Sequence, residues 1–284
     1  MTICVITAHV SGGPADDAVL ARAHELAEAF KGHIDAAYAR PNPCLTPPPT
    51  GLGLFPSVYR DLAAQAETVW RETADAARGK FEAWRIANRL TAAERAGGGR
   101  RPSAAWREAG AQEALGRASP LADLLILPPP AARGGDTLGH ELTLLHEGRP
   151  VLFAPAGASA PLLGGAVLIA WNGSSEAFRA VGAALPLLAR AKRVVICTVA
   201  EKNFTAAIAG ALVDYLAWHG IAAETQAAPK AGSVEAALEA AARAVDANLL
   251  VMGAYTRGRL REWVFGGFTR HMLERAKLPV LMAR

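Results

Sequence analysis

The segment from Leu249 to Arg284 reads LLVMGAYTRGRLREWVFGGFTRHMLERAKLPVLMAR. Leu249 to Met252 has the continuous apolar pattern of a buried strand, and Gly253 opens a turn. An arginine-rich loop leads to the pair Gly266-Gly267 at the start of a helix, and Pro279 to Met282 is a short final strand. A strand that ends in glycine, followed by a basic loop and by glycines at a helix start, can wrap main-chain N–H groups around an anion. We therefore expect any functional site of this chain to lie in this segment.

The composition is that of a soluble globular protein large enough for two domains. The chain has 284 residues, of which 51% are hydrophobic and 20% charged, and this balance argues against disorder. A domain usually holds roughly 100 to 200 residues, so two domains of ordinary size fit. The formal net charge is +4, and the basic residues are spread along the chain. Nucleic-acid-binding proteins cluster their basic residues, so we expect no nucleic-acid partner.

Cysteine usage and the N-terminus favour a cytoplasmic location. Cys4, Cys44 and Cys197 are odd in number and far apart, so we expect neither a disulfide framework nor a metal motif. The N-terminal MTICVITAHVSGG has no basic region before its apolar run, which makes it a first strand rather than a signal peptide. No window offers about 18 consecutive strongly apolar residues, so we expect no membrane span and no membrane partner.

The N-terminal segment predicts one βαβ unit. Thr2 to Ala8 is a short apolar run, a helix with apolar residues at helical spacing ends near Phe30, and Ile34 to Ala39 is the next strand. This order implies a parallel sheet with right-handed crossovers. The rest of the first half predicts a loop over Pro41–Pro56, a helix over Val58–Ala87, a loop over Gly97–Pro102, a strand over Ala104–Glu108, a helix over Ala111–Ala118, a strand over Ala122–Leu127, a helix over Leu138–His146 and a strand over Val151–Phe153.

After a small-residue linker, Ala156 to Gly165, the same alternation restarts. We expect strands over Ala166–Ala170, Arg193–Val199 and Ile221–Thr225, and helices over Ser175–Leu188, Phe204–His219 and Val234–Val245, before the closing segment. The sequence itself also repeats, because ADLLILP at Ala122–Pro128 is similar to ANLLVMG at Ala247–Gly253. Likewise Pro150 in LLHEGRPVLFAP aligns with Pro279 in MLERAKLPVLMAR.

The repeat predicts an α/β protein of two tandem domains, residues 1–155 and 163–284, each an open five-stranded parallel sheet with helices on both faces. The second copy has its extra residues in the glycine- and arginine-rich loop, so the halves differ most there. In the first half Pro128 takes the position of Gly253, and proline has no N–H and a fixed φ. We therefore expect a structural first half that pairs with the second half. Open sheet edges also allow a homodimer.

The spacing after Gly253 resembles the nucleotide-binding pattern of the universal stress protein family. That pattern has a glycine after the fourth strand, a glycine three residues later, nine residues, and then glycine with serine or threonine. Here Gly253 takes the first position, Thr256 the second and Gly266 the third. Gly267 stands where the hydroxyl residue is expected, although Thr269 offers a hydroxyl two positions later. The alternative is that these glycines serve only as turn residues.

The resemblance implies a fold of the Rossmann-like adenine nucleotide alpha hydrolase type and a role in the stress response by binding or signalling. It implies that the second half binds ATP or another adenine nucleotide, with Mg²⁺ if the ligand is a triphosphate. Arg257 and Arg259 can neutralise its phosphates, or they can simply form a solvated face of the loop. The expected binding residues are Ala170, Trp171, Asn172, Val199, Met252, Gly253, Thr256, Arg257, Arg259, Gly266, Gly267, Phe268 and Thr269.

Asn172 stands at a strand tip where the resembled family usually has an aspartate that meets the adenine and ribose. An amide can still donate and accept hydrogen bonds there, but it carries no charge. Strand tips of this kind are where open α/β sheets bind ligands. The alternative is that Asn172, Gly173 and Ser174 form only the turn and the N-cap of the next helix.

The sequence shows no catalytic constellation, so we expect a binding protein rather than an enzyme. The seven histidines have no metal-ligand spacing, and no serine lies in a nucleophile-elbow motif. Two alternatives stay open beside nucleotide binding. The first is a structural or partner-interaction module of the same fold that binds no nucleotide, and the second is a slow ATP hydrolase without an identifiable base.

Overall fold

The strands and helices alternate as the sequence pattern predicts. The computed structural model describes residues 2–40, 56–94, 101–110, 121–130, 148–157, 160–199, 206–228, 233–254, 269, 271, 272, 275 and 277–284. The first half contains β1 (Val5–Val10), α1 (Asp16–Phe30), β2 (His33–Arg40), α2 (Pro56–Ala87), β3 (Thr91–Ala92), β4 (Ser103–Gly110), β5 (Leu124–Leu127) and β6 (Val151–Phe153). The second contains β7 (Ala166–Ala170), α5 (Ser175–Leu188), β8 (Arg193–Val199), α6 (Ala206–Trp218), β9 (Glu224–Ala228), α7 (Val234–Ala244), β10 (Ala247–Gly253) and β11 (Val280–Ala283).

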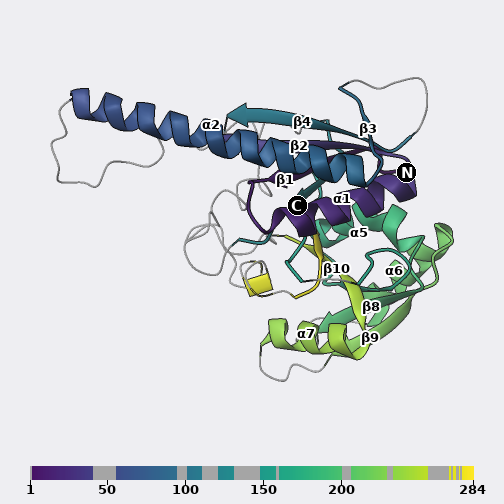
Figure 1. Cartoon of the computed structure of the whole chain (residues 1–284). Coiled ribbons are helices and arrows are strands. Elements are labelled where there is room, and N and C mark those ends of the chain that lie inside the picture. Colours follow the sequence, from purple (N-terminus) through teal and green to yellow (C-terminus); the bar gives the residue numbers. More distant parts are fainter. Residues whose placement is uncertain are drawn as a thin grey trace.

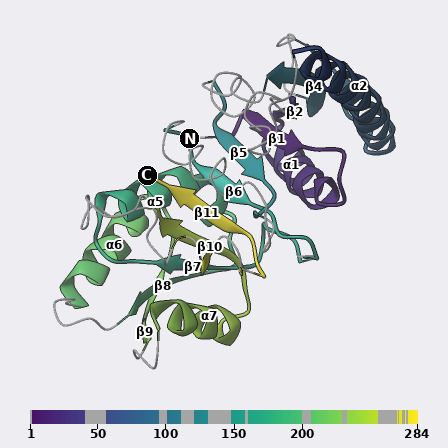
Figure 2. The same ribbon diagram turned by 90° about the vertical axis from the view of Figure 1, so that its left-hand side faces the viewer.

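One continuous sheet of eleven strands runs through both halves, in the order β3-β4-β2-β1-β5-β6-β11-β10-β7-β8-β9. Neighbouring strands are parallel except at the centre, where β6 and β11 pair antiparallel, with Val280 opposite Phe153 and Met282 opposite Val151. Figure 2 shows these two strands side by side between the halves. The strand order is therefore repeated outward from this pair, and the predicted α/β fold with a mostly parallel sheet is confirmed. The first half contributes six strands rather than the five predicted, and the two halves share one sheet.

Apolar residues on the two faces of the sheet form two separate cores. On one face Ile34 and Ile169 belong to a cluster that extends through both halves. The cluster includes residues of α1, α2, α5 and α6, and Figure 1 shows where these helices lie. On the other face Leu168 and Val195 pack with α7 and with Met272. Because side chains alternate along a strand, strands buried on both sides need apolar residues at every position, as in LLIL of β5.

Specific contacts join the halves beside the central strand pair. The backbone N–H of Leu163 donates to Glu25 Oε1 of α1 at 2.8 Å. Arg190, just after α5, donates from Nη2 to the carbonyl oxygen of Ala29 at 2.9 Å and lies 4.5 Å from the ring centre of Phe30. Leu162 is 2% exposed within the shared core. The expected linker is therefore packed against the first half where it is described.

A few element boundaries differ from the predicted ones. The strand predicted over Ile221–Thr225 is β9, which begins at Glu224, because Ile221 follows the positive-φ Gly220 and is buried in the core between α6 and the sheet. β3 was not predicted from the sequence; its two residues are held by pairing with β4. The predicted elements over Pro41–Pro56, Ala111–Ala118 and Leu138–His146 lie almost wholly outside the described residues.

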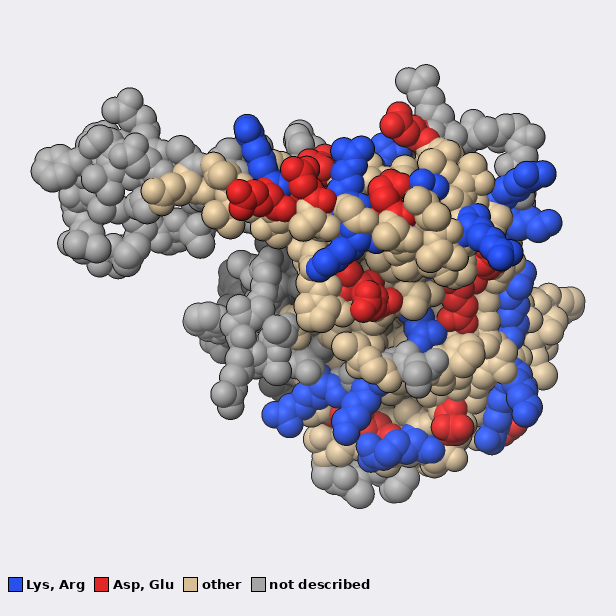
Figure 3. All heavy atoms as spheres, in the orientation of Figure 1, with Lys and Arg blue, Asp and Glu red and all other residues tan. Residues whose placement is uncertain are grey.

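The distribution of surface charge and the length of the helices bear on which partners the chain can have. On the face drawn in Figure 3, lysine and arginine side chains lie among aspartate and glutamate side chains. Within the described ranges, none of the helices combines the length and the apolar character that crossing a membrane requires.

Candidate functional site

The turn between β7 and α5 is organised by three consecutive residues. The Asn172 Oδ1 atom accepts a hydrogen bond from the backbone N–H of Ser174 at 3.1 Å. Gly173 has φ +72°, which a residue with a side chain rarely adopts. Ser174 is the N-cap of α5, and its Oγ accepts from the N–H of Ala177 at 3.1 Å. Asn172, Gly173 and Ser174 therefore form a turn and the N-cap of α5, and among the described residues no hydrogen-bond acceptor faces the Asn172 Nδ2 group.

Trp171 ties the end of β7 to its neighbours. Its backbone N–H donates to the Cys197 carbonyl oxygen at 2.9 Å, and its Nε1–H donates to the Ile208 carbonyl oxygen at 3.1 Å. The residue is 9% exposed and belongs to the core. Its indole therefore holds α6 against the strand end, which is a structural role.

Gly253 ends β10 beside the first turn of α5. A Cβ atom on this glycine would lie 2.5 Å from the backbone nitrogen of Ala177 and 2.7 Å from the backbone carbon of Glu176. In the sheet, Gly253 pairs with Ala283 of β11, and the preceding Met252 pairs with Ala170 of β7. Glycine is therefore required here for the close approach of a helix start to a strand end.

The remaining predicted residues are only partly described. Val199 ends β8 and is half-buried, as is Ala170 at the end of β7. Thr269 lies in a helical position and is 4% exposed. Thr256, Arg257, Arg259, Gly266, Gly267 and Phe268 lie outside the described residues. The structure thus brings together the ends of β7, β8 and β10 with the start of α5.

Charged groups around this end of the sheet were not predicted as part of the site. Glu176 lies in the first turn of α5 and is 5% exposed, where a carboxylate interacts favourably with the helix dipole. On α7, a hydrogen bond with its own backbone N–H is the main cause that lowers the pKa of Glu235, with Ser233 and His271 contributing. His271 Nε2 lies 3.3 Å from Glu239 Oε1, which connects the helical segment after the glycine loop to α7. The sequence alone gives little indication of these contacts, because each depends on tertiary packing.

The described residues offer neither a reactive Cys197 nor a cluster of metal ligands. Burial raises the pKa of the Cys197 thiol to about 11, so it is protonated and poorly reactive at neutral pH. In the part of the chain that the structure describes, no group of three or more His, Cys, Asp or Glu side chains is arranged to hold a metal ion.

The corresponding turn of the first half is closed by a carboxylate. The sheet registers and the sequence repeat align Ser11 and Gly12 with Asn172 and Gly173. Asp16 accepts from the Ser11 N–H at 2.9 Å, from its Oγ–H at 3.1 Å and from the Gly12 N–H at 2.7 Å. Gly12 has φ +82°, so the two N–H groups form a concave anion-binding turn that Asp16 fills.

The second half keeps the same turn without the carboxylate. Ala177 takes the position that Asp16 has in the first half, so this position offers no carboxylate to the turn. Among the described residues, none accepts a hydrogen bond from the N–H groups of Asn172 or Gly173, and both residues are exposed. The two halves therefore differ in whether an external anion can reach this turn.

Comparison with known proteins gives one family match, which lies in the second half. A family model described as universal stress protein family matches residues 165–284. A solved universal stress protein from Archaeoglobus fulgidus DSM 4304 is similar over 99% of this chain and 98% of its own, with a TM-score of 0.65 and 16% identity. A functionally unknown protein from Pseudomonas aeruginosa PAO1 is similar over 99% and 92% of the two chains, with a TM-score of 0.54 and 15% identity.

A universal stress protein solved in complex with cAMP is 25% identical over 43% of this chain and 98% of its own, with a TM-score of 0.37. Among curated protein sequences, none matches the chain. The family model and the likeness over the whole length agree with the strand order repeated in both halves. Residues 165–284 therefore match the model of the universal stress protein family, and the whole length of the chain has the fold of a solved universal stress protein.

Proposed function

We propose that the second half, residues 163–284, binds ATP or a related adenine nucleotide, with Mg²⁺ when the ligand is a triphosphate. The protein acts in the cytoplasm, in the stress response, by binding and signalling rather than by turnover. The first half, residues 1–155, supports the second through the shared sheet and core and does not bind nucleotide in the same way.

The observation that carries this proposal is the difference between the two equivalent turns. In the first half the carboxylate of Asp16 takes both N–H groups of the turn at 2.7 and 2.9 Å. In the second half no described residue accepts from the N–H groups of Asn172 and Gly173, which are exposed and lie at the carboxyl ends of parallel strands where α/β sheets bind ligands. The sequence pattern from Gly253 to Gly267 begins at the adjacent strand end.

A second candidate function is a partner-interaction module that binds no nucleotide. It is favoured by the structural roles of three predicted site residues. Trp171 is buried against α6, Asn172 holds the turn, and Gly253 makes room for α5. Each of these would be needed in the fold without any ligand.

Isothermal titration of the full chain with ATP and MgCl₂ tests the proposal. We expect one site per chain. The variant Arg257→Ala/Arg259→Ala should weaken binding by about tenfold or more, because charge-assisted hydrogen bonds to phosphate are lost. The matched control Arg78→Ala/Arg101→Ala removes the same charge from exposed positions of the first half and should bind as the wild type does.

The same titration separates the two candidates. No heat from the folded wild type would overturn nucleotide binding and favour the interaction module. In that case the variant Thr256→Gly/Gly267→Ser, which restores the family pattern, should gain a site. Gly253→Val is unsuitable for this test, because its side chain would displace the backbone of α5 with or without a ligand.

A further inference from the structure

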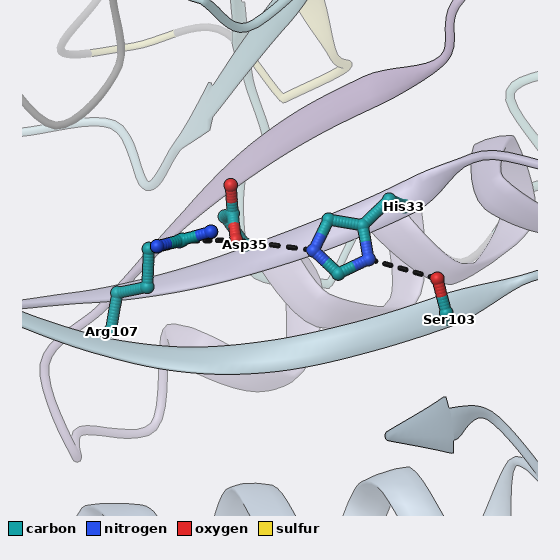
Figure 4. Close-up of polar contacts among 4 residues, drawn as sticks. All are labelled: His33, Asp35, Ser103 and Arg107. Atoms are coloured by element: carbon teal, nitrogen blue, oxygen red, sulfur yellow. Dashed lines mark hydrogen bonds and ion pairs between the residues drawn. The ribbon is translucent and has the colours of Figure 1, made fainter. Parts of the chain in front are cut away.

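A chain of polar side chains lies on one face of β2 and β4, away from the predicted nucleotide site (Figure 4). His33 and Asp35 are two residues apart on β2, and Ser103 and Arg107 are four apart on β4. The strands are parallel with His33 opposite Ser103, so all four side chains share one face of the sheet. The opposite face of the same strands is packed by α2 through Phe81.

The four side chains form a connected hydrogen-bonded relay. His33 Nδ1 lies 2.8 Å from Ser103 Oγ, and His33 Nε2 lies 3.2 Å from Asp35 Oδ1. Arg107 Nε–H donates to the same Asp35 oxygen. Burial alone would raise the pKa of Asp35, but the hydrogen bonds from His33 and Arg107 outweigh it and keep the net pKa below its ordinary value.

The ionised carboxylate determines the tautomer of His33. A carboxylate can only accept, so in the neutral imidazole the proton sits on Nε2 and faces Asp35. Nδ1 then carries a lone pair and can only accept, so the Ser103 hydroxyl donates to it. The contacts are those of a serine nucleophile with its general base and an orienting acid, with the two ring nitrogens in exchanged roles.

The second half shows that the sheet does not need these polar groups. The strand registers align Asp35 with Val195, which is 1% exposed in the apolar core. The Asp35 side chain is 12% exposed, and burying a carboxylate requires partners that a valine does not need. The His33 side chain is 22% exposed and Ser103 is half-buried, so neither residue is fully enclosed by the described part of the chain.

We propose that Ser103, His33 and Asp35 form an acyl-transfer site that hydrolyses activated esters. Ser103 is the nucleophile, His33 the general base, and Asp35 and Arg107 are positioning residues that hold the imidazole in the required tautomer. Activated esters are the fitting substrate class, because the relay supplies a nucleophile and a base and a good leaving group needs little further help.

The reaction runs in two balanced steps. Ser103 Oγ bonds to the carbonyl carbon while its proton passes to His33 Nδ1. The ester C–O bond then breaks, and the leaving alcohol takes that proton. Water next bonds to the acyl carbon and gives a proton to Nδ1, the bond to Oγ breaks, and Oγ takes the proton back. The products are a carboxylic acid and an alcohol, and the enzyme returns to its initial state.

A fluorophosphonate probe on the full chain tests the nucleophile, because Ser103 Oγ should bond to phosphorus with loss of fluoride. We expect one label per chain, mapped to Ser103 by peptide mass spectrometry. The labelling rate should fall at least about a hundredfold in His33→Gln, the usual contribution of a general base. The control Ser233→Ala removes an exposed N-cap hydroxyl far along the chain and should label as the wild type does.

Asp35→Asn separates a positioning role from a structural one. The amide of this variant can donate a hydrogen bond to His33 Nε2, which leaves the imidazole proton on Nδ1. Nδ1 can then no longer accept the proton of the Ser103 hydroxyl. The wild-type labelling rate should not follow the hydroxide concentration, because His33 supplies the base, while the variant rate should rise in proportion to it. Label on another residue, no label on the folded wild type, or unchanged labelling in His33→Gln overturns the proposal.

Discussion

Gly253 and Ala177 are in contact across the junction between β10 and α5, so closely that a Cβ on Gly253 would lie 2.5 Å from the Ala177 nitrogen. The neighbouring atoms are backbone, which cannot move aside as a flexible side chain can. We therefore expect Gly253→Ala to lower the free energy of unfolding by about 1 to 3 kcal/mol, as overpacking does. Urea unfolding measures this without any ligand.

Gly182→Ala is the matched control for that substitution. Gly182 lies within α5, and a Cβ there would meet nothing within 4 Å. Alanine in a helix interior is favoured over glycine by roughly 0.5 to 1 kcal/mol, so this variant should be as stable as the wild type or more so. Equal stability of Gly253→Ala and the wild type would show that the first turn of α5 can shift.

The turn at Ser11 and Gly12 should depend on the carboxylate of Asp16. Removing it in Asp16→Ala leaves two N–H groups without their acceptor, and we expect a loss of about 2 kcal/mol, typical of hydrogen bonds to a charged group. Added sulfate should restore part of this loss, because an anion can occupy the vacated turn.

Asp17→Ala provides the comparison for Asp16→Ala. Asp17 lies in the same first turn of α1 but is exposed, so both variants lose the same interaction with the helix dipole. Only Asp16→Ala should respond to sulfate in thermal unfolding at fixed ionic strength. An equal response of both variants would contradict the role of the turn as an anion site.

Much of the fold follows from local pattern, and most of the site does not. The bounds of α5, β7 and β6 agree with those predicted, because a glycine or proline precedes each and an apolar period runs through it. β3 could not be predicted, since two residues carry no period and the strand exists only through pairing with β4. The β9 boundary was misplaced because an apolar residue, Ile221, serves the core before the strand begins.

Contacts between distant residues explain why the site was only partly predicted. The Asn172–Ser174 turn was foreseen as one of two alternatives, because its hydrogen bonds are local. The packing of Gly253 on α5 depends on how a helix start meets a strand end 76 residues later, and spacing alone cannot show this. The relay from His33 to Ser103 likewise exists only because two strands pair in one register.

Asp35 should make stability depend on pH in the acid range. Its folded pKa lies below its ordinary value of 3.8, so the stability it contributes is present above that value and is lost as pH falls through the folded pKa. We expect Asp35→Asn to be less stable than the wild type by about 2 kcal/mol at neutral pH, as for lost hydrogen bonds to a charge. The difference should shrink below about pH 4.

Glu224→Gln serves as the control for that pH dependence. Glu224 pairs with Arg193 at 2.8 Å, but both side chains are largely exposed. Exposed ion pairs contribute little to stability, so this variant should unfold like the wild type across the same pH range. A constant difference between Asp35→Asn and the wild type down to pH 2 would show that Asp35 is not ionised in the fold.

Arg190 should couple the two halves. Its guanidinium donates to the Ala29 carbonyl oxygen at 2.9 Å and lies 4.5 Å from the ring centre of Phe30. The variant Arg190→Ala therefore removes a hydrogen bond and a cation–π contact between the two halves. We expect a loss of about 1 to 2 kcal/mol in chemical unfolding. Arg179→Ala, an exposed arginine on α5, should cost less than about 0.5 kcal/mol. Because the halves share one sheet and a core that extends through both, unfolding should stay a single transition in Arg190→Ala. A second transition would show that the contact between the halves depends mainly on this residue.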